Sequence, residues 1–128
     1  MKTLDNNNNN ESSQPGVLFA VVGKSGVGKD TIIEAARQRL ANDKKFHFPK
    51  RIITRKSDAG GEDHIEISEA DFKQKSEQGA YSLWWQAHGL YYGISVEIET
   101  RLRSGQSIIV NISRRAVPQA KLKFPHFE

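Results

Sequence analysis

The feature that most constrains the fold of this chain is a glycine-rich segment near its amino terminus, Gly23–Asp30 (GKSGVGKD). The apolar run Val17–Val22 precedes it and is suited to a strand buried on both faces. In Thr31–Leu40, which follows, apolar residues recur at helical spacing. A strand, a glycine loop and a helix N-terminus together can hold a polyphosphate by backbone N–H groups. The segment therefore predicts a phosphate-binding loop (P-loop) for a nucleotide.

The spacing G-x-x-x-x-G-K also predicts individual contacts. Lys29 is placed to reach the β- and γ-phosphates of ATP, and the alternative is a glycine-rich turn with a solvated lysine. The usual motif continues with a Ser or Thr hydroxyl that ligates Mg²⁺, but this chain has Asp30. We expect Asp30, with Thr31, to place Mg²⁺ directly or through water, although an acid here also suits the helix dipole. The predicted nucleotide-binding residues are Gly23, Lys24, Ser25, Gly26, Val27, Gly28, Lys29, Asp30 and Thr31.

Composition narrows the class of protein. A chain of 128 residues is expected to form one domain, here from residue 16, because residues 1–15 are Asn-rich and have little to bury. The net charge of +4 comes from 19 basic and 15 acidic residues scattered without an aromatic-interleaved stripe. We therefore expect a small phosphorylated substrate and no nucleic acid. The chain has no cysteine, no signal peptide and no apolar run of membrane length, so we expect a cytoplasmic protein without membrane contact.

The remaining pattern predicts an α/β fold in two parts. Strands at 17–22, 46–55 and 107–112 are expected to form a parallel sheet, with the third beside the first. Pro49 indicates that the second strand begins after it or lies at an edge of the sheet. Residues 64–94 predict a small inserted sheet: a strand at 64–67, a helix from its N-cap Ser68 to residue 79, and two antiparallel strands around Gly89. Helices are expected at 96–104 and 118–124. The core is thus residues 16–56 and 95–128, and the inserted α+β subdomain is about 57–94.

Three segments of this pattern resemble the guanylate-kinase-like branch of the nucleoside monophosphate kinases. They are Thr54–Arg55, the strand 64–68 leading to Phe72, and Gly89–Gly93 (GLYYG), which occur in the right order and at similar spacing. The resemblance implies a P-loop kinase core with an inserted acceptor-binding subdomain. It also implies that Arg55 and Tyr92 hold the phosphate of the acceptor.

The chain is more closely similar to the ribose 1,5-bisphosphate phosphokinases of phosphonate catabolism. The similarity covers about residues 17–124 and rests on residues 28–30 (GKD), 53–55 (ITR), 62–65 (EDHI), 89–93 (GLYYG), 96–98 (VEI) and 110–114 (VNISR). It implies transfer of the γ-phosphoryl group of ATP to the 1-phosphate of ribose 1,5-bisphosphate, which gives 5-phosphoribosyl 1-diphosphate. Lys29 and Asp30 are then the expected catalytic residues. The expected acceptor-binding residues are Arg55, Glu62, His64, Tyr92, Asn111 and Arg114.

Several alternatives stay open at this level. Guanylate kinases read guanine with carboxylates at positions matching Leu83 and either Asn111 or Ser113. Each hydrogen bond lost to a buried polar edge costs about 1–3 kcal/mol, so this chain is expected to discriminate against GMP. A guanylate or related nucleotide kinase is the alternative. His64 can be a structural histidine instead of a ligand contact, and Arg51 can be a surface strand residue instead of a phosphate contact.

Aromatic neighbours and the carboxyl terminus carry two further expectations. Trp84 and Trp85 are expected to split between core and surface, as are Tyr91 and Tyr92, with Tyr92 on the side of the site.

Kinases of this kind continue after the third strand with a further core strand, an arginine-rich lid, and a final strand and helix. We expect the catalytic assembly to be incomplete at the carboxyl terminus and the first strand to have an open apolar edge. A non-catalytic phosphate-binding module is therefore a third alternative.

Overall fold

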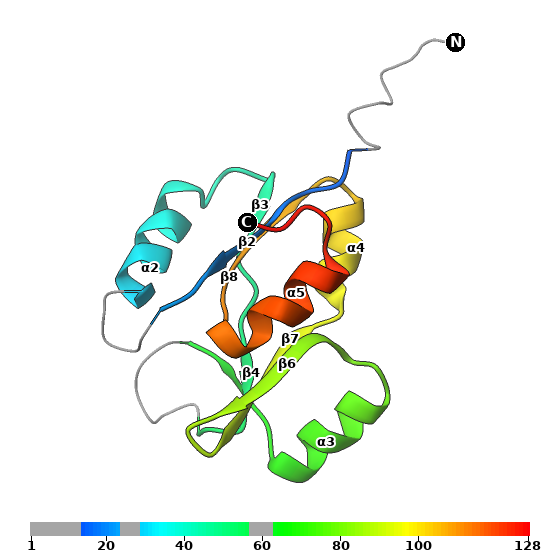
Figure 1. The fold of residues 1–128 in the computed structure, drawn as a ribbon. Helices are drawn as coiled ribbons and strands as arrows, with labels where there is room; N and C mark the ends of the chain where they lie inside the picture. Colours follow the sequence, from blue (N-terminus) through cyan, green and yellow to red (C-terminus); the bar gives the residue numbers. More distant parts are fainter. Residues whose placement is uncertain (1–13, 24–28, 57–62) are drawn as a thin grey trace.

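The structure, a computed structural model, describes residues 14–23, 29–56 and 63–128 and has a mixed α/β fold with two sheets (Figure 1). Side chains of the first helix are described from Thr31 onwards. In chain order the elements are β2 (Leu18–Val21), α2 (Lys29–Arg39), β3 (Phe46–His47), β4 (Ile52–Ile53), β5 (Ile65–Glu66), α3 (Glu69–Glu77), β6 (Tyr81–Ala87), β7 (Leu90–Ser95), α4 (Glu97–Arg103), β8 (Ser107–Asn111), the 3-10 turn η1 (Arg114–Ala116) and α5 (Val117–Lys123).

The first sheet is parallel and has the order β2-β8-β3. β8 lies beside β2 with Leu18 opposite Ile108 and Val21 opposite Asn111, so the predicted pairing of the third strand with the first is confirmed. β3 pairs with the other side of β8, and α2 makes the crossover from β2 to β3. The carboxyl ends of β2 and β8 therefore lie together where residues 22–28 lead into α2.

The expected single strand over residues 46–55 is wrong. Phe46–His47 joins the parallel sheet as β3, whereas Ile52–Ile53 forms β4 in the second sheet. Pro49 lies between them and has no N–H to donate to a ladder, so the strand is interrupted there instead of beginning there. The segment from Arg51 to Arg55 consequently belongs with the second sheet.

The second sheet has the order β5-β4-β7-β6 and contains the predicted antiparallel hairpin. The hairpin turn consists of His88 (φ 54°) and Gly89 (φ 76°), and two consecutive left-handed residues match the right-handed twist of the strands. β4 pairs in parallel with β5 and in antiparallel with β7. The predicted N-cap of α3 is confirmed, because the Ser68 Oγ accepts a hydrogen bond of 3.1 Å from the Asp71 N–H.

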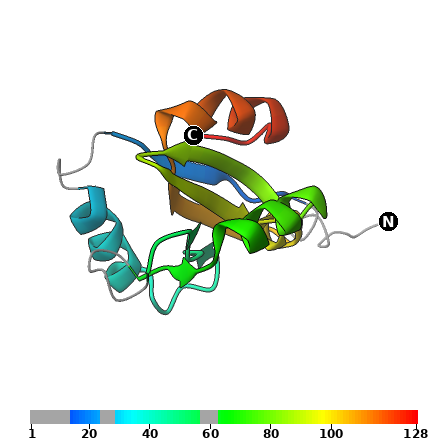
Figure 2. The same cartoon turned by 90° about the horizontal axis from the view of Figure 1, so that it is seen from below.

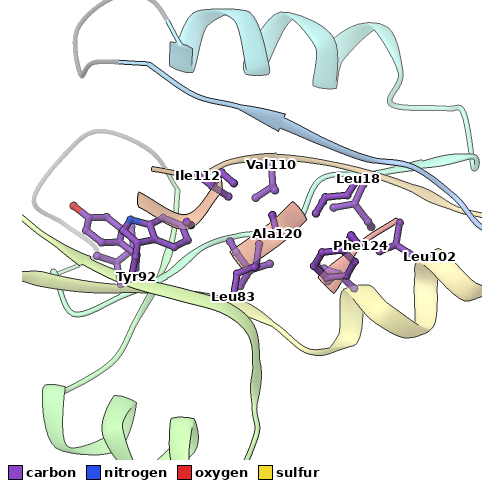
Figure 3. Packing of buried hydrophobic residues seen from close by; sticks show 14 residues of the cluster. Leu18, Leu83, Tyr92, Leu102, Val110, Ile112, Ala120 and Phe124 are labelled. Atoms are coloured by element: carbon purple, nitrogen blue, oxygen red, sulfur yellow. The ribbon is translucent and has the colours of Figure 1, made fainter. Parts of the chain in front are cut away.

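One apolar core joins the two sheets. Figure 3 shows Leu18 of β2, Val110 of β8 and Ile112, which directly follows β8, packed against Leu83 of β6 and Tyr92 of β7. Leu102 and Phe124 of the α4–α5 region lie at the opposite end of this cluster from Tyr92. Figure 2 shows α5 and α3 on opposite sides of the β6–β7 hairpin. The described cluster is Leu18, Ile53, Leu83, Trp85, Tyr92, Ile94, Ile98, Leu102, Ile108, Val110, Ile112, Ala116, Ala120 and Phe124.

The side chains of β2 are less buried than expected, and the edge of β2 that faces away from β8 is hydrogen-bonded. Only Leu18 of β2 is fully buried, and the other three residues are half-buried. The Leu18 N–H donates to the His126 carbonyl at 2.8 Å, and the Glu128 N–H donates back to the Leu18 carbonyl at 2.8 Å. The Ala20 N–H donates to the Glu128 carbonyl at 2.7 Å. The expectation of an unpaired edge is therefore wrong for residues 18–20.

The outer face of the hairpin carries a second aromatic cluster beside α3. Phe72 stacks on Tyr81 at 4.5 Å between ring centroids and lies 5.3 Å from Tyr91 and 6.2 Å from Trp84. Trp84 is 43% exposed, while Trp85 is 5% exposed on the core side, so the predicted split of this pair is confirmed. Tyr91 and Tyr92 divide in the same way, with Tyr92 in the core cluster.

Substituting Gly93 with alanine is expected to destabilise the fold by about 1–3 kcal/mol through overpacking. A Cβ at this position would lie 2.9 Å from Tyr81 Cδ1 and 3.0 Å from Phe72 Cε2. Urea denaturation of Gly93→Ala measures this loss. As a control, the loss should shrink when Tyr81→Val is already present, since the clashing ring is then gone. An equal loss in both backgrounds would mean that the ring contact is not the cause.

A polar cluster connects β6, α4 and α5. The Ser82 hydroxyl donates to Glu99 Oε2 at 2.5 Å, and Lys123 Nζ lies 3.1 Å from the same oxygen. Burial raises the pKa of Glu99, but the hydrogen bonds from Ser82 and Lys123 outweigh it, and the resulting pKa lies below the usual value. The ionised carboxylate therefore stabilises the fold.

We expect Glu99→Gln to lower the free energy of unfolding by roughly 1 kcal/mol near pH 7. Because the folded pKa is depressed, the stabilisation is present above the unfolded pKa of about 4.3 and is lost as the pH falls through the folded pKa. The difference between wild type and variant should thus disappear in acid, as measured by urea unfolding at several pH values. Glu97→Gln is the matched control, since Glu97 is on the same helix and its ion pair with Arg101 is solvent-exposed. A difference that persists unchanged at pH 3 would contradict the assignment.

Candidate phosphate and acceptor site

The predicted phosphate loop lies between elements that the structure describes. β2 ends at Val21 and α2 begins at Lys29, so strand, loop and helix occur in the predicted order. Gly23, the second residue after β2, has φ 153°, which side-chain-bearing residues rarely adopt. Lys24–Gly28 lie outside the described residues. Lys29 and Asp30 open α2, and Thr31 is exposed in its first turn.

Asn111 presents a buried polar atom at the same end of the parallel sheet. It is the last residue of β8, lies opposite Val21 and is 7% exposed. Because strand residues alternate, Asn111 faces away from Val110 and the core cluster, toward the side on which Figure 3 shows α2. Its Oδ1 has no hydrogen-bond partner among the described residues. A buried acceptor without a partner costs about 1–3 kcal/mol, so this oxygen is suited to a ligand or to a ligand's water.

Arg55 and His64 are held together at the edge of the second sheet. The His64 ring is 5% exposed, and its Nε2 lies 2.8 Å from the Arg55 carbonyl oxygen, which makes this nitrogen the donor. Arg55 itself is half-buried, and its Nε has no hydrogen-bond partner within the described part of the chain. His64 therefore positions the backbone of Arg55, whose guanidinium group keeps hydrogen-bonding capacity for an anion.

Tyr92 lies between two other side chains in the second sheet. Its ring stacks on Trp85 with 5.5 Å between centroids and 2° between planes. The guanidinium carbon of Arg51 lies over the Tyr92 ring at 5.1 Å from its centroid. Figure 3 shows the Tyr92 hydroxyl directed away from the apolar cluster. Arg51, Tyr92 and Trp85, which come from three neighbouring segments of the second sheet, are thus packed against one another.

The structure brings some predicted residues together and leaves others apart. The Tyr91 N–H donates to Thr54 Oγ1 at 2.9 Å and the Thr54 N–H donates to the Tyr91 carbonyl at 3.1 Å, which ties the residues before Arg55 and Tyr92 to each other. Arg114 is exposed at the start of η1 and makes no hydrogen bond or ion pair to the residues that the structure describes. Glu62 lies outside the described residues.

Two residues were missed or undervalued at the sequence level. Arg51 is half-buried on Tyr92, although a surface strand residue was one expectation for it. The sequence predicted only that one of Trp84 and Trp85 lies in the core, and it did not predict that Trp85 stacks on the ring of Tyr92. The available signal was the predicted strand over residues 46–55, in whose alternation Arg51 shares a face with Ile53.

The described residues contain no cluster of three or more His, Cys, Asp or Glu side chains that could hold a metal ion. The lack of such a cluster is compatible with a Mg²⁺ site, because Mg²⁺ is usually held by one or two carboxylates together with water and phosphate oxygens. Asp30 and Thr31 stay predictions as the residues that would hold it, and the side chain of Asp30 lies outside the part of the chain that the structure describes. Within the described segments, no helix is long and apolar enough to cross a membrane.

Comparison with known proteins identifies relatives over most of the chain. It is 48% identical over 102 residues to a ribose 1,5-bisphosphate phosphokinase of Brucella melitensis, which covers 80% of this chain and 53% of that protein. It is 42% identical over 114 residues to the protein of the same name from Chromobacterium violaceum, covering 89% of this chain and 60% of the relative. A bifunctional ribose 1,5-bisphosphokinase-thymidine phosphorylase of Roseobacter denitrificans is 46% identical over 112 residues, 88% of this chain and 16% of that protein.

The fold also has a solved counterpart. A guanylate kinase from Anaplasma phagocytophilum matches 91% of this chain and 59% of its own length with a TM-score of 0.71 at 14% identity, a likeness of fold alone. No family model matches the chain. The chain spans little more than half the length of the monofunctional relatives given above. It is therefore a homologue of the ribose 1,5-bisphosphate phosphokinases with a guanylate-kinase-like fold.

Proposed function

We propose that the chain carries the nucleotide-binding and acceptor-binding parts of an ATP-dependent ribose 1,5-bisphosphate phosphokinase. The reaction moves the γ-phosphoryl group of ATP to the 1-phosphate of ribose 1,5-bisphosphate and gives 5-phosphoribosyl 1-diphosphate and ADP. In this proposal the protein acts in phosphonate catabolism and is cytoplasmic, where ATP is supplied. The relatives named for this activity support the proposal.

The observation that carries the choice of acceptor is the chemistry of the core-facing side of the second sheet. This side presents Arg55 and Tyr92, which suit a phosphate. At the position matching the guanine-reading carboxylate it presents Leu83, which is 0% exposed within the apolar cluster. A base edge placed there would lose its hydrogen bonds, whereas a phosphorylated sugar without a base would lose none.

The chemistry needs little from the protein beyond positioning and charge. The nucleophile is an oxygen of the acceptor's 1-phosphate, which is already anionic at neutral pH, so no side chain has to remove a proton. Its bond to the γ-phosphorus forms as the bond between that phosphorus and the β,γ-bridging oxygen breaks, and ADP leaves. Lys29 neutralises charge on the β- and γ-phosphates, and Arg55 and Tyr92 hold the acceptor phosphate in line.

The remaining residues complete the proposed site. Asp30 and Thr31 would hold Mg²⁺, which when bound neutralises phosphate charge, and the Asn111 Oδ1 would accept a hydrogen bond from a water in its shell. His64 positions Arg55 through its backbone carbonyl. Glu62 and Arg114 stay predictions as contacts to the sugar and its phosphate.

Titration calorimetry of the purified chain tests the proposal directly. Ribose 1,5-bisphosphate is expected to bind more tightly than GMP, and Arg55→Met should weaken it by roughly 10- to 100-fold, since a charge-assisted hydrogen bond contributes about 1.5–3 kcal/mol. The neighbouring Lys56→Met, which removes the same charge from an exposed side chain, is the control and should change affinity little. Tighter binding of GMP would favour the nucleotide-kinase alternative, and binding of neither ligand would contradict an acceptor site.

A further inference from the structure

Strand β6 is an edge of the second sheet, and side chains from the carboxyl-terminal helical region bind its outer side. The sheet order β5-β4-β7-β6 gives β6 one neighbouring strand. On the other side, the Trp84 N–H donates to Gln119 Oε1 at 3.2 Å, and Gln119 Nε2 donates to the Trp84 carbonyl at 3.0 Å. The side-chain amide of Gln119 thus makes the pair of hydrogen bonds that a further antiparallel strand would make.

Two more hydrogen bonds continue this contact in register along β6. Arg115 Nη1 donates to the Gln86 carbonyl at 3.4 Å, and Lys123 Nζ donates to the Ser82 carbonyl at 3.3 Å. Arg115, Gln119 and Lys123, each four residues apart, form what we call the polar stripe of η1 and α5. Four helical residues rise about 6.0 Å and two strand residues about 6.6–6.8 Å, so the stripe matches every second residue of the strand.

Apolar packing holds the polar stripe in place. Ala116, Ala120 and Phe124 each directly follow one of its residues, and all three are buried in the core cluster. The core contact therefore fixes the helical region beside the sheet and directs the neighbouring stripe to the edge of β6. The hydrogen bonds of Gln119 and Arg115 are exposed to solvent. Water can replace them at little cost, so they contribute little to the stability of the fold.

The sequence of the hairpin indicates what the cover prevents. Residues 78–96 contain no Asp, Glu, Lys, Arg or Pro, and Tyr81–Ala87 is a seven-residue strand with three aromatic side chains. An uncharged strand of this kind is a template for pairing with another chain, and edge strands commonly carry Lys or Pro against it. β5, at the other edge, has only two residues. For β6 the cations come instead from Arg115 and Lys123.

We propose that the polar stripe acts as a substitute strand, which prevents β6 from pairing along its edge with β6 of a second copy of this chain. A second copy is the partner that fits, because two identical uncharged strands can pair in antiparallel about a two-fold axis. Pairing would replace the side-chain hydrogen bonds of the stripe by backbone hydrogen bonds. The edge of β6 is therefore a latent interface between copies, and this role does not depend on the proposed function.

Sedimentation velocity of the full chain at a series of concentrations measures the effect of removing the cover. The double variant Arg115→Ala/Gln119→Ala keeps Lys123, which also pairs with Glu99. We expect it to dimerise with a dissociation constant at least about tenfold lower than that of wild type, because the edge is then free. Its urea midpoint should stay close to that of wild type. Hydrogen exchange of the Trp84 amide should become faster in dilute solution and slow again where dimers form.

Two further variants show whether the edge of β6 is the cause. Lys121→Ala removes a cation from α5 outside the polar stripe and should leave self-association unchanged. Gln86→Lys, added to the double variant, places a charge on β6 itself and should restore the behaviour of wild type. If the double variant does not fold, Gln119→Ala alone provides the test. Self-association equal to that of wild type, equal to that of Lys121→Ala, or unaffected by Gln86→Lys would overturn the proposal.

Discussion

The parallel pairing of β2 with β8 is the constraint on which the rest of the structure depends. It places the end of β2 beside Asn111, so the predicted phosphate loop starts next to a buried amide oxygen without a hydrogen-bond partner in the described part of the chain. A parallel pair requires a crossover, and α2 provides it with its N-terminus at that same end. Backbone geometry thus brings the dipole of α2 and the polar end of β8 to one place before any side chain is considered.

The acceptor side depends on a second constraint, the apolar core that the two sheets share. The ring of Tyr92 packs in this core, and its hydroxyl points away from it, as Figure 3 shows. Its neighbours in the sheet set the chemistry around it: Trp85 fixes the ring, and Arg51 lies on it. A buried Leu83 in the same cluster removes the polar group that reading a base would need. In the proposed function, selection of the acceptor therefore depends on packing as much as on charge.

Local patterns predicted most of the elements but not how the strands are shared between sheets. The strand-loop-helix order, the cap of α3 by Ser68 and the hairpin around Gly89 depend on neighbouring residues and were predictable. The split at Pro49 was misjudged, because a proline interrupts a ladder equally well at its start or in its middle. The pairing of Leu18 with the carboxyl-terminal residues is a contact over more than a hundred positions, which periodicity cannot show. For the same reason Arg51 was undervalued, since its importance comes from Tyr92 on another strand.

The continuity of the core has a consequence for motion. Kinases commonly close around their substrates by rotation of parts about hinges, which requires an interface that can open without exposing much apolar surface. Here Val110 of the first sheet and Tyr92 of the second are members of one buried cluster, so a large rotation between the sheets would bring water into it. The second sheet is thus preset relative to the first sheet. In the proposed function, the substrates would then approach through side-chain rotations or smaller shear-like shifts that keep the cluster packed.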